Sequence, residues 1–343
     1  MSQSDAFADA LRQILGRECR PDDVRAVEAG GSHANLWKTL DDAGFADALT
    51  FCGDDAVSLA DVYPMVEACG AHALPVPLAQ SMFARALLVQ AGIDPSPGAS
   101  IAFASGASGA SGIVCHDTGY GQVADWALVC DGAVARLLPC ASAQRTPRGN
   151  EGAADLAWNS ETVAKAAAFP APATGWREIE AAIYAAQLAG AMSTVLAATI
   201  QYANDRAQFG KPIGKFQAIQ HQIGVMAEQT WAARMAAMLA FSSRTHTPVP
   251  QLAAAAKART SEAAAVVAAL AHAVHGAIGF TQEFDLQLHT RRLYAWRLAT
   301  GSENYWNAVV GRALIGAGQS TALEFMEAAF AQGGLVEPSD SED

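Results

Sequence analysis

The sequence predicts a mainly α-helical protein with a small β domain between two helical regions. Of its 343 residues, 51% are hydrophobic and 16% are charged, and alanine is abundant, a composition that favours tightly packed helices. Apolar residues recur at helical spacing except in residues 97–172, where short β-like runs replace them. We therefore expect an N-terminal helical domain (1–96), a reduced middle β domain (97–172), a C-terminal four-helix bundle (173–332) and an acidic, disordered tail (333–343).

The N-terminal domain is expected to contain helices separated by short breaks. Ser58, with Asp61 three residues later, has the pattern of a capping box that starts a helix. Gly44 has the position of a residue that ends one. The expected helices are Ala6–Leu15, Asn35–Gly44, Ser58–Gly70 and Met82–Gly92.

The middle region has the pattern of short strands separated by Gly, Ser and Asp. The expected strands are Ser100–Phe103, Gly112–Cys115, Val123–Cys130 and Val134–Leu138. Residues 104–112 (ASGASGASG) have low complexity, so we expect a flexible loop there. Pro170 and Pro172 indicate a linker to the next region.

The C-terminal region returns to helical spacing. The expected helices are 176–206, 215–244, 250–275 and 303–332. Four long helices in one block predict a bundle.

Charge and composition exclude several classes of function. The net charge is -12 and no basic run is present, so we expect no nucleic-acid partner. Six cysteines without a CxxC pair indicate reduced thiols of a cytoplasmic protein. The eight histidines lack metal-ligand spacing, so no metal site is expected. The chain opens polar and acidic, unlike a signal peptide, and we found no uninterrupted apolar stretch of about 18 residues, so we expect no membrane span.

The most informative segment is residues 201–221, QYANDRAQFGKPIGKFQAIQH. Glycine and proline break a long helix, and helical spacing resumes from Lys215. The break gathers Arg206, Phe209 and Gln217, which suit an anion that carries a flat ring system. A tight turn between helices with a salt-bridged arginine is the alternative.

The pattern Tyr-x3-Arg-x-Gln-Phe-Gly-x-Pro-Ile-x3-Gln resembles a segment of the acyl-CoA dehydrogenases. In that family the segment lies in the C-terminal helical domain and binds FAD across a subunit interface. The resemblance implies that Arg206, Gln208, Phe209 and Gln217 bind FAD.

A second segment, His275–Glu283, contains small residues that let a backbone approach a ligand closely. Its alternative interpretation is a helix C-cap followed by a loop. It resembles the family's Gly-Gly-x-Gly-Phe segment, which contacts the FAD pyrophosphate and adenosine of a neighbouring subunit. This implies cofactor contacts for His275, Gly276, Ala277 and Gly279, although Ala277 replaces the second glycine.

The tripeptide Thr300-Gly301-Ser302 corresponds to a family Glu-Gly-Thr whose glutamate is the catalytic base. Thr300 cannot remove a proton from carbon at neutral pH. The resemblance keeps Gly301 and Ser302 as cofactor contacts. It also matches Arg312 to an arginine near the cofactor and the CoA, and so to substrate binding.

Some members of the family place the base 26 residues before the flavin-binding arginine, a position that is Glu180 here. Glu180 aligns with an apolar helical stripe through Leu188 and Met192, where a carboxylate is unusual unless it has a function or a partner. Two alternatives stay open: an exposed glutamate that is favoured by the helix dipole, and Glu303 as the base.

The resemblance implies an FAD-dependent acyl-CoA dehydrogenase. Such an enzyme oxidises an acyl-CoA to the 2,3-enoyl-CoA by α-proton abstraction and β-hydride transfer to flavin N5, and passes electrons to an electron-transferring flavoprotein. It would be a homodimer, a homotetramer or a heteromer with a homologous subunit.

The middle region departs from the family, because its Thr-Glu-Pro and Gly-Ser-Asp motifs are missing and only Gly119–Trp126 resembles a family strand. This is similar to subunits of heteromeric dehydrogenases for steroid or bulky acyl groups. Two alternatives to an active enzyme follow: a non-catalytic chain that completes the FAD site of a homologous partner, and a helical interaction protein without a cofactor.

Overall fold

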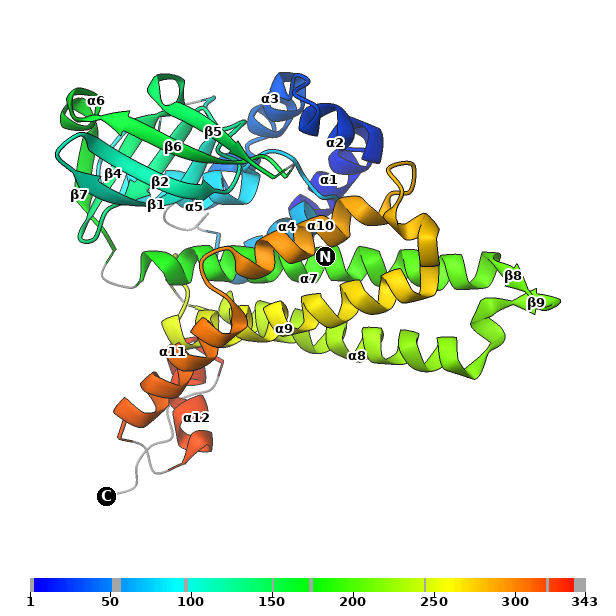
Figure 1. Cartoon of the computed structure of the whole chain (residues 1–343). Helices are drawn as coiled ribbons and strands as arrows, with labels where there is room; N and C mark the ends of the chain where they lie inside the picture. Colours follow the sequence, from blue (N-terminus) through cyan, green and yellow to red (C-terminus); the bar gives the residue numbers. More distant parts are fainter. Residues whose placement is uncertain are drawn as a thin grey trace. The chain divides into compact units, whose positions relative to one another are not determined.

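The computed structural model divides into two compact units (Figure 1). The first contains residues Met1–Val57, Pro64–Cys69 and Leu74–Trp176, and the second contains Ser58–Tyr63, Gly70–Ala73 and Arg177–Asp343. The structure describes residues 3–50, 57–95, 98–149, 151–172, 175–243, 245–318 and 321–335.

The helices of the N-terminal region are short, as expected. Ser58 N donates to Asp61 Oδ2 at 3.0 Å and Asp61 N donates to Ser58 Oγ at 3.3 Å, which confirms the predicted capping box. The eight-residue α2, with Pro21 at its first position, was not predicted because it is too short to show a period. The elements are α1 (Gln3–Glu18), α2 (Pro21–Glu28), α3 (Ala34–Asp42), η1 (Phe45–Asp47), α4 (Leu59–Ala71) and α5 (Leu78–Gln90).

The β region of the first unit forms one seven-stranded sheet in the order β5-β6-β2-β1-β3-β4-β7. Strands β1 and β3 are parallel, and all other neighbours are antiparallel. The strands are β1 (Ile101–Gly109), β2 (Gly112–Thr118), β3 (Trp126–Cys130), β4 (Val134–Pro139), β5 (Gln144–Arg148), β6 (Ala153–Asn159) and β7 (Ala167–Pro170). The 3-10 helix η3 (Cys140–Ser142) lies between β4 and β5, and α6 (Ser160–Lys165) lies between β6 and β7. The sequence did not predict strands β5, β6 and β7.

The flexible loop predicted at residues 104–112 is wrong, because β1 continues to Gly109 and forms a hairpin with β2. The glycines serve close packing here. A Cβ on Gly106 would lie 2.7 Å from Ile113 Cγ2, and one on Gly112, whose φ is +132°, would lie 1.9 Å from Trp158 O. Small residues were therefore mistaken for a flexible segment.

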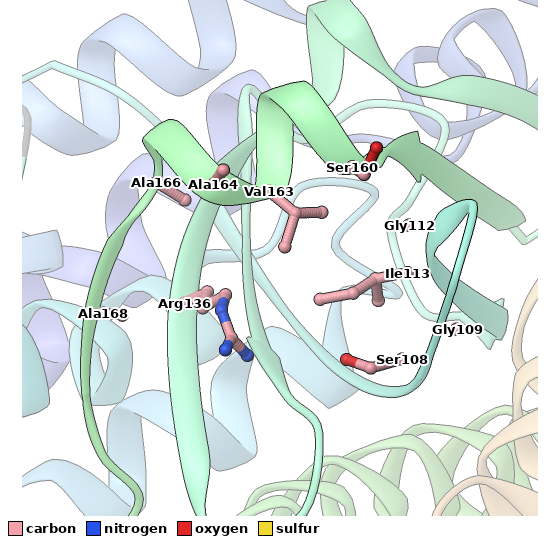
Figure 2. A pocket seen from close by; sticks show the side chains of 10 residues that line it. All are labelled: Ser108, Gly109, Gly112, Ile113, Arg136, Ser160, Val163, Ala164, Ala166 and Ala168. Carbon is pink, nitrogen blue, oxygen red and sulfur yellow. The ribbon is translucent and has the colours of Figure 1, made fainter.

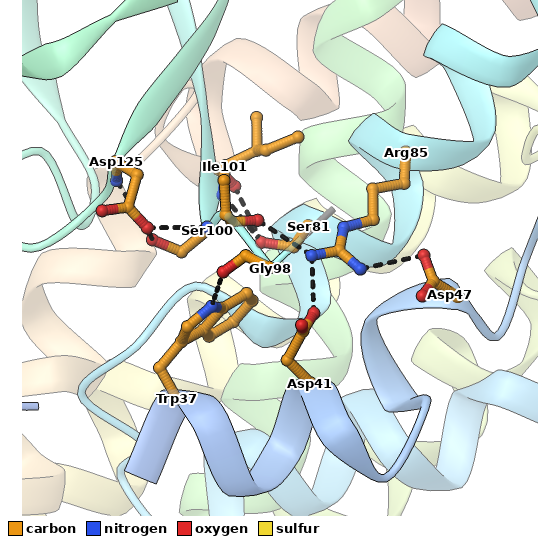
Figure 3. Close-up of polar contacts among 10 residues, drawn as sticks. Trp37, Asp41, Asp47, Ser81, Arg85, Gly98, Ser100, Ile101 and Asp125 are labelled. Atoms are coloured by element: carbon orange, nitrogen blue, oxygen red, sulfur yellow. Dashed lines mark hydrogen bonds and ion pairs between the residues drawn. The ribbon is translucent and has the colours of Figure 1, made fainter. Parts of the chain in front are cut away.

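A buried arginine connects the helices of the first unit to its sheet (Figure 3). Arg85 donates to Asp41 Oδ1 at 2.6 Å, to Asp47 Oδ1 at 2.9 Å and to Ala99 O at 2.9 Å. Trp37 Nε1 donates to Gly98 O at 2.8 Å. Removal of one partner of such a buried ion pair typically costs about 3–5 kcal/mol, so the network contributes strongly to the unit.

The second unit contains the predicted four-helix bundle, which is confirmed with a change in membership. Its core joins side chains of α7 (Trp176–Asp205), α8 (Gln217–Ala240), α9 (Pro250–His275) and α10 (Leu286–Leu298). Helix α10 was not predicted because its sequence, LQLHTRRLYAWRL, has a weak apolar stripe and buries a charged residue, Arg292. The predicted helix 303–332 is two helices, α11 (Glu303–Gly316) and α12 (Ala322–Gln332).

Helices α7 and α9 are long and apolar enough to cross a membrane by length and composition alone. In α7, 67% of the most apolar window is buried inside the protein, as is typical of a core helix. Both helices supply side chains to the bundle core, which accounts for their composition.

Five of the six cysteines lie in the described ranges, and all five are buried: Cys19, Cys69, Cys115, Cys130 and Cys140. Cys52 lies outside those ranges, as do residues 336–343 of the predicted acidic tail.

Candidate functional site

The segment after α7 forms a tight hairpin in which β8 (Ala207–Gln208) pairs with β9 (Lys211–Pro212). Phe209 and Gly210 form the two-residue turn, with φ of +53° and +80°. Positive φ at both positions is the pattern of a type I′ turn. The predicted break is therefore a defined hairpin, followed by the 3-10 helix η4 (Ile213–Lys215).

The side chains of this hairpin are open to solvent. Phe209 is 91% exposed and has a positive φ, two unfavourable properties for a bulky apolar residue. Arg206, Gln208 and Gln217 are also exposed, and within the described ranges their side chains have no hydrogen-bond or ion-pair partner. The alternative of a salt-bridged arginine therefore does not hold, and all four side chains are free to meet a ligand.

The second predicted segment begins where α9 ends. Gly276 has a φ of +66° and starts the 3-10 helix η5 (Gly276–Phe280). Gly276 and Ala277 are exposed, whereas Gly279 is buried, and a Cβ on Gly279 would lie 3.0 Å from His275 Cβ. The small residues thus leave an accessible backbone at Gly276–Ala277.

Tyr202 and His275 connect the two segments. Their rings stack with centroids 4.4 Å apart, and Tyr202 Oη donates to His275 O at 3.3 Å. Ala203, Ile213 and Val274 form a small apolar cluster between them. The structure therefore brings the hairpin and the η5 segment together at one end of the bundle.

The environment of His275 fixes its protonation. Its Nδ1 lies 2.8 Å from Ala271 O and must carry a hydrogen to bond that carbonyl. Burial lowers the pKa of His275, which favours the neutral ring. Its Nε2 is then an acceptor, and it is buried without a partner among the described residues.

Glu180 lies near the start of α7 and is only 9% exposed, so the alternative of a solvent-exposed glutamate is wrong. Its carboxyl group has no hydrogen-bond partner in the part of the chain that the structure describes. Burial raises the pKa of Glu180 to about 7, and the positive charge of Arg177 opposes this rise. A carboxyl group with this pKa can accept a proton near neutral pH.

Glu303 has the opposite environment. Arg297 Nε donates to Glu303 Oε2 at 3.0 Å, and a second contact joins Arg297 Nη2 to Oε1. The hydrogen bond from Arg297 lowers the pKa of Glu303, so its carboxylate is a weak base. Thr300, at the family's usual base position, has a buried hydroxyl without a partner in the described ranges.

Glu180 and the Thr300–Ser302 turn lie at the same end of the bundle. Ala181 packs against Trp306 of α11 in one apolar cluster, and Arg177 Nη1 donates to Tyr305 Oη at 2.8 Å. The β8–β9 hairpin lies at the other end of α7, away from α11 (Figure 1). Arg312 is exposed on α11, farther along the helix.

The first unit contains a pocket of about 380 Å³ on its sheet (Figure 2). Arg136, Ile113 and Val163 point into it, and Ser108 and Ser160 line its edge. Arg136 Nη1 lies 2.7 Å from Asp131 Oδ1, which neutralises the guanidinium charge. The charged residue among those that line the pocket is therefore already in an ion pair.

Residues 178–315 match the family model for the acyl-CoA dehydrogenase C-terminal domain. This segment is therefore similar to the C-terminal domain of the acyl-CoA dehydrogenases. The matched residues include Glu180, the β8–β9 hairpin, the η5 segment and Arg312. The predicted resemblance is confirmed.

Similar proteins extend the likeness to the rest of the chain. The acyl-CoA dehydrogenase IpdE2 of Mycobacterium tuberculosis is 28% identical over 298 residues, which cover 83% of this chain and 89% of that protein. The ChsE4-ChsE5 complex of the same species has a TM-score of 0.76 at 20% identity, over 94% of this chain and 99% of the matched one. Butyryl-CoA dehydrogenase of Megasphaera elsdenii has a TM-score of 0.74 at 19% identity, over 92% and 99%. These likenesses confirm the predicted fold class.

One buried residue of the matched segment was not predicted from the sequence. Lys257 lies on α9 with no exposed surface, and its amine contacts the backbone beside Gly301. The sequence does contain a signal for Lys257, because it is the first charged residue in the alanine-rich segment that begins α9.

Proposed function

We propose that this chain is an FAD-dependent acyl-CoA dehydrogenase that oxidises an acyl-CoA thioester to the 2,3-enoyl-CoA. The observation that carries the proposal is Glu180, a buried carboxyl group near the start of α7 that has no hydrogen-bond partner in the described ranges. Abstraction of an α-proton from a thioester needs a base of this kind in a dry environment. Electrons would pass to an electron-transferring flavoprotein, in the cytoplasm.

FAD is the cofactor of the acyl-CoA dehydrogenase family, and the hairpin end of the bundle fits it. Arg206 offers a free guanidinium to the pyrophosphate, and Phe209 offers an exposed ring face to the flat ring systems. Gln208 and Gln217 offer free amides, and Gly276 and Ala277 offer open backbone. Bound FAD would supply the acceptor for the hydride that leaves the β carbon.

Glu180 performs the proton chemistry in this proposal. Its burial disfavours the charged carboxylate and so raises its affinity for the α-proton. Arg177 limits the rise in pKa, which keeps part of the population deprotonated at neutral pH. Arg312, exposed and without a partner in the described ranges, is proposed to contact the CoA.

The proposed site needs two chains. Glu180 and Arg206 are separated by 26 residues at opposite ends of α7, and at 1.5 Å per helical residue they lie about 39 Å apart. This is farther than one dinucleotide reaches. We therefore infer that the hairpin end of one protomer meets the Glu180 end of another, in a homodimer, a homotetramer or a heteromer with a homologous subunit.

A second function is favoured by two observations: Thr300 stands at the family's usual base position, and the middle region lacks the Thr-Glu-Pro and Gly-Ser-Asp motifs. The chain would then be a non-catalytic subunit that completes the FAD site of a homologous partner. In that case its hairpin end would bind FAD, and Glu180 would have no catalytic role.

The test is to purify the chain alone and measure its flavin absorbance and its turnover of a panel of CoA esters. Turnover that is lost in Glu180→Gln supports the enzyme. Protein that is colourless alone, binds FAD only with a homologous chain, and forms a complex whose turnover survives Glu180→Gln supports the partner role. Protein that never binds FAD under either condition refutes both functions.

A further inference from the structure

Lys257 is a fully buried lysine whose amine has three hydrogen-bond acceptors. Its Nζ donates to Ser261 Oγ at 2.8 Å, to Arg297 O at 2.8 Å and to Gly301 O at 3.3 Å. A buried ammonium is unfavourable unless its donors are satisfied, and here all three have acceptors. The amine is therefore held at a specific point of the backbone.

Two of those acceptors lie on either side of one turn. Arg297 O belongs to the last turn of α10, where carbonyl groups have no partner within the helix, and Gly301 O lies four residues later, just before α11. Ser261 Oγ also donates to Arg297 O, at 3.2 Å. The amine of Lys257 thus forms hydrogen bonds to the backbone on both sides of the turn between α10 and α11.

The turn itself has an unfavourable backbone conformation. Thr300 has a φ of +63°, which is rare for a β-branched residue. Gly301 has a φ of +127°, and a Cβ there would lie 2.6 Å from the Tyr305 ring. The Thr300 hydroxyl is buried without a partner in the described ranges, so it does not stabilise the turn. Such a conformation persists only when its surroundings impose it.

We propose that Lys257 is a positioning residue that holds the Thr300–Ser302 turn in the conformation in which Gly301 and Ser302 meet the cofactor. This inference rests on the proposed FAD-dependent function. Lys257 acts through the carbonyl groups of Arg297 and Gly301 and does not touch the reacting atoms.

Burial and two neighbouring charges set the protonation of the amine. Glu303 favours the charged amine, and Arg297, which is paired with Glu303, disfavours it. Burial is the largest influence and lowers the pKa of Lys257 to about 7. A neutral amine has two hydrogens in place of three and can hold fewer of the acceptors.

The test uses Lys257→Met, which keeps an apolar stem and removes the donors, with Ser261→Ala as the matched control that leaves both backbone bonds of Lys257. Hydrogen exchange of the backbone at residues 298–304 is measured without added FAD, and FAD affinity is measured separately by fluorescence. We expect Lys257→Met to speed exchange in this segment and to weaken FAD binding, each about tenfold, because it loses hydrogen bonds to a charged group. Ser261→Ala should have a smaller effect on both.

Folded Lys257→Met with wild-type exchange at residues 298–304 would overturn the proposal, as would faster exchange with unchanged FAD affinity. If Lys257→Met does not fold, Lys257→Gln takes its place, because its shorter side chain does not reach both backbone carbonyl groups, and wild-type exchange and affinity in that variant would overturn the proposal. A wild-type protein that binds no FAD, either alone or with a homologous chain, refutes the proposed function and, with it, the cofactor role of the turn. The exchange measurement then still tests the contact between Lys257 and the turn.

Discussion

The two ends of the four-helix bundle differ in whether their charged side chains are exposed or buried. At the hairpin end, Arg206 is exposed and unpaired within the described ranges, beside the exposed ring of Phe209. At the other end, Glu180 and Lys257 are buried, and burial moves the pKa of each toward about 7. The first environment suits the binding of a large anion, and the second suits proton chemistry. In the proposed function, the exposed end binds the pyrophosphate of FAD and the buried end holds the base, and the two ends differ in local dielectric.

The largest expected effect is at the buried end. Glu180→Gln keeps the shape and removes the base, so we expect turnover of a CoA ester to fall by about 10²–10⁴-fold with FAD affinity nearly unchanged. Glu303→Gln is the control, because its carboxylate is paired with Arg297, and its turnover should fall far less. If the two variants lose turnover equally, Glu180 is not the base.

The pH dependence of stability tests the same end without any cofactor. Glu180 has a pKa of about 7 in the folded protein against an ordinary value of 4.5, so the folded state binds more protons between these two pH values. The free energy of unfolding should therefore fall as pH rises from 4.5 to 7, by about 3 kcal/mol, and be unaffected by this group above and below that window. Denaturant unfolding should show this fall in the wild type relative to Glu180→Gln. Parallel pH profiles for the two proteins would contradict the burial of this carboxyl group.

At the exposed end, Arg206→Ala should weaken FAD binding by about 10-fold to 100-fold through the loss of a charge-assisted contact. Lys211→Ala removes an equal charge from the same hairpin and serves as the control. Titration of the flavin measures both. Equal losses would mean that net charge attracts FAD and that the forked guanidinium has no special role.

The smallest expected effect concerns Phe209. Asparagine tolerates a positive φ better than phenylalanine, so Phe209→Asn should raise the free energy of unfolding by up to about 1 kcal/mol. The same variant should weaken FAD binding severalfold, because it loses a ring face. Phe216→Leu is the control. Because the ring of Phe216 is partly buried, this variant should lower the free energy of unfolding instead. A Phe209→Asn variant that binds FAD like the wild type would show that the exposed ring serves another partner.

The sequence predicted elements correctly where an apolar pattern is long or where glycine and proline mark a break. The predicted helix 250–275 has the bounds of α9, and 176–206 differs from α7 by one residue. It failed at α10, where a buried arginine obscures the apolar stripe, and at β1, where glycine and alanine were taken for a loop. In both cases the neighbouring elements decide the structure, since Arg292 and Gly106 are explained by what packs against them.

The sequence by itself determined the helical class, the two cofactor-like segments and the candidate base at Glu180. The helical class and the break after the first long helix depend on the spacing of residues along the chain, which local backbone preferences convert into helix faces and turns. The cofactor roles and the candidate base are what the resemblance to the acyl-CoA dehydrogenases implies. Only the tertiary structure decided that Glu180 is buried, that Glu303 is neutralised by Arg297 and that Lys257 reaches the turn at Gly301. Burial and ion pairing arise between segments far apart in the chain, and they set the pKa values on which the chemistry depends.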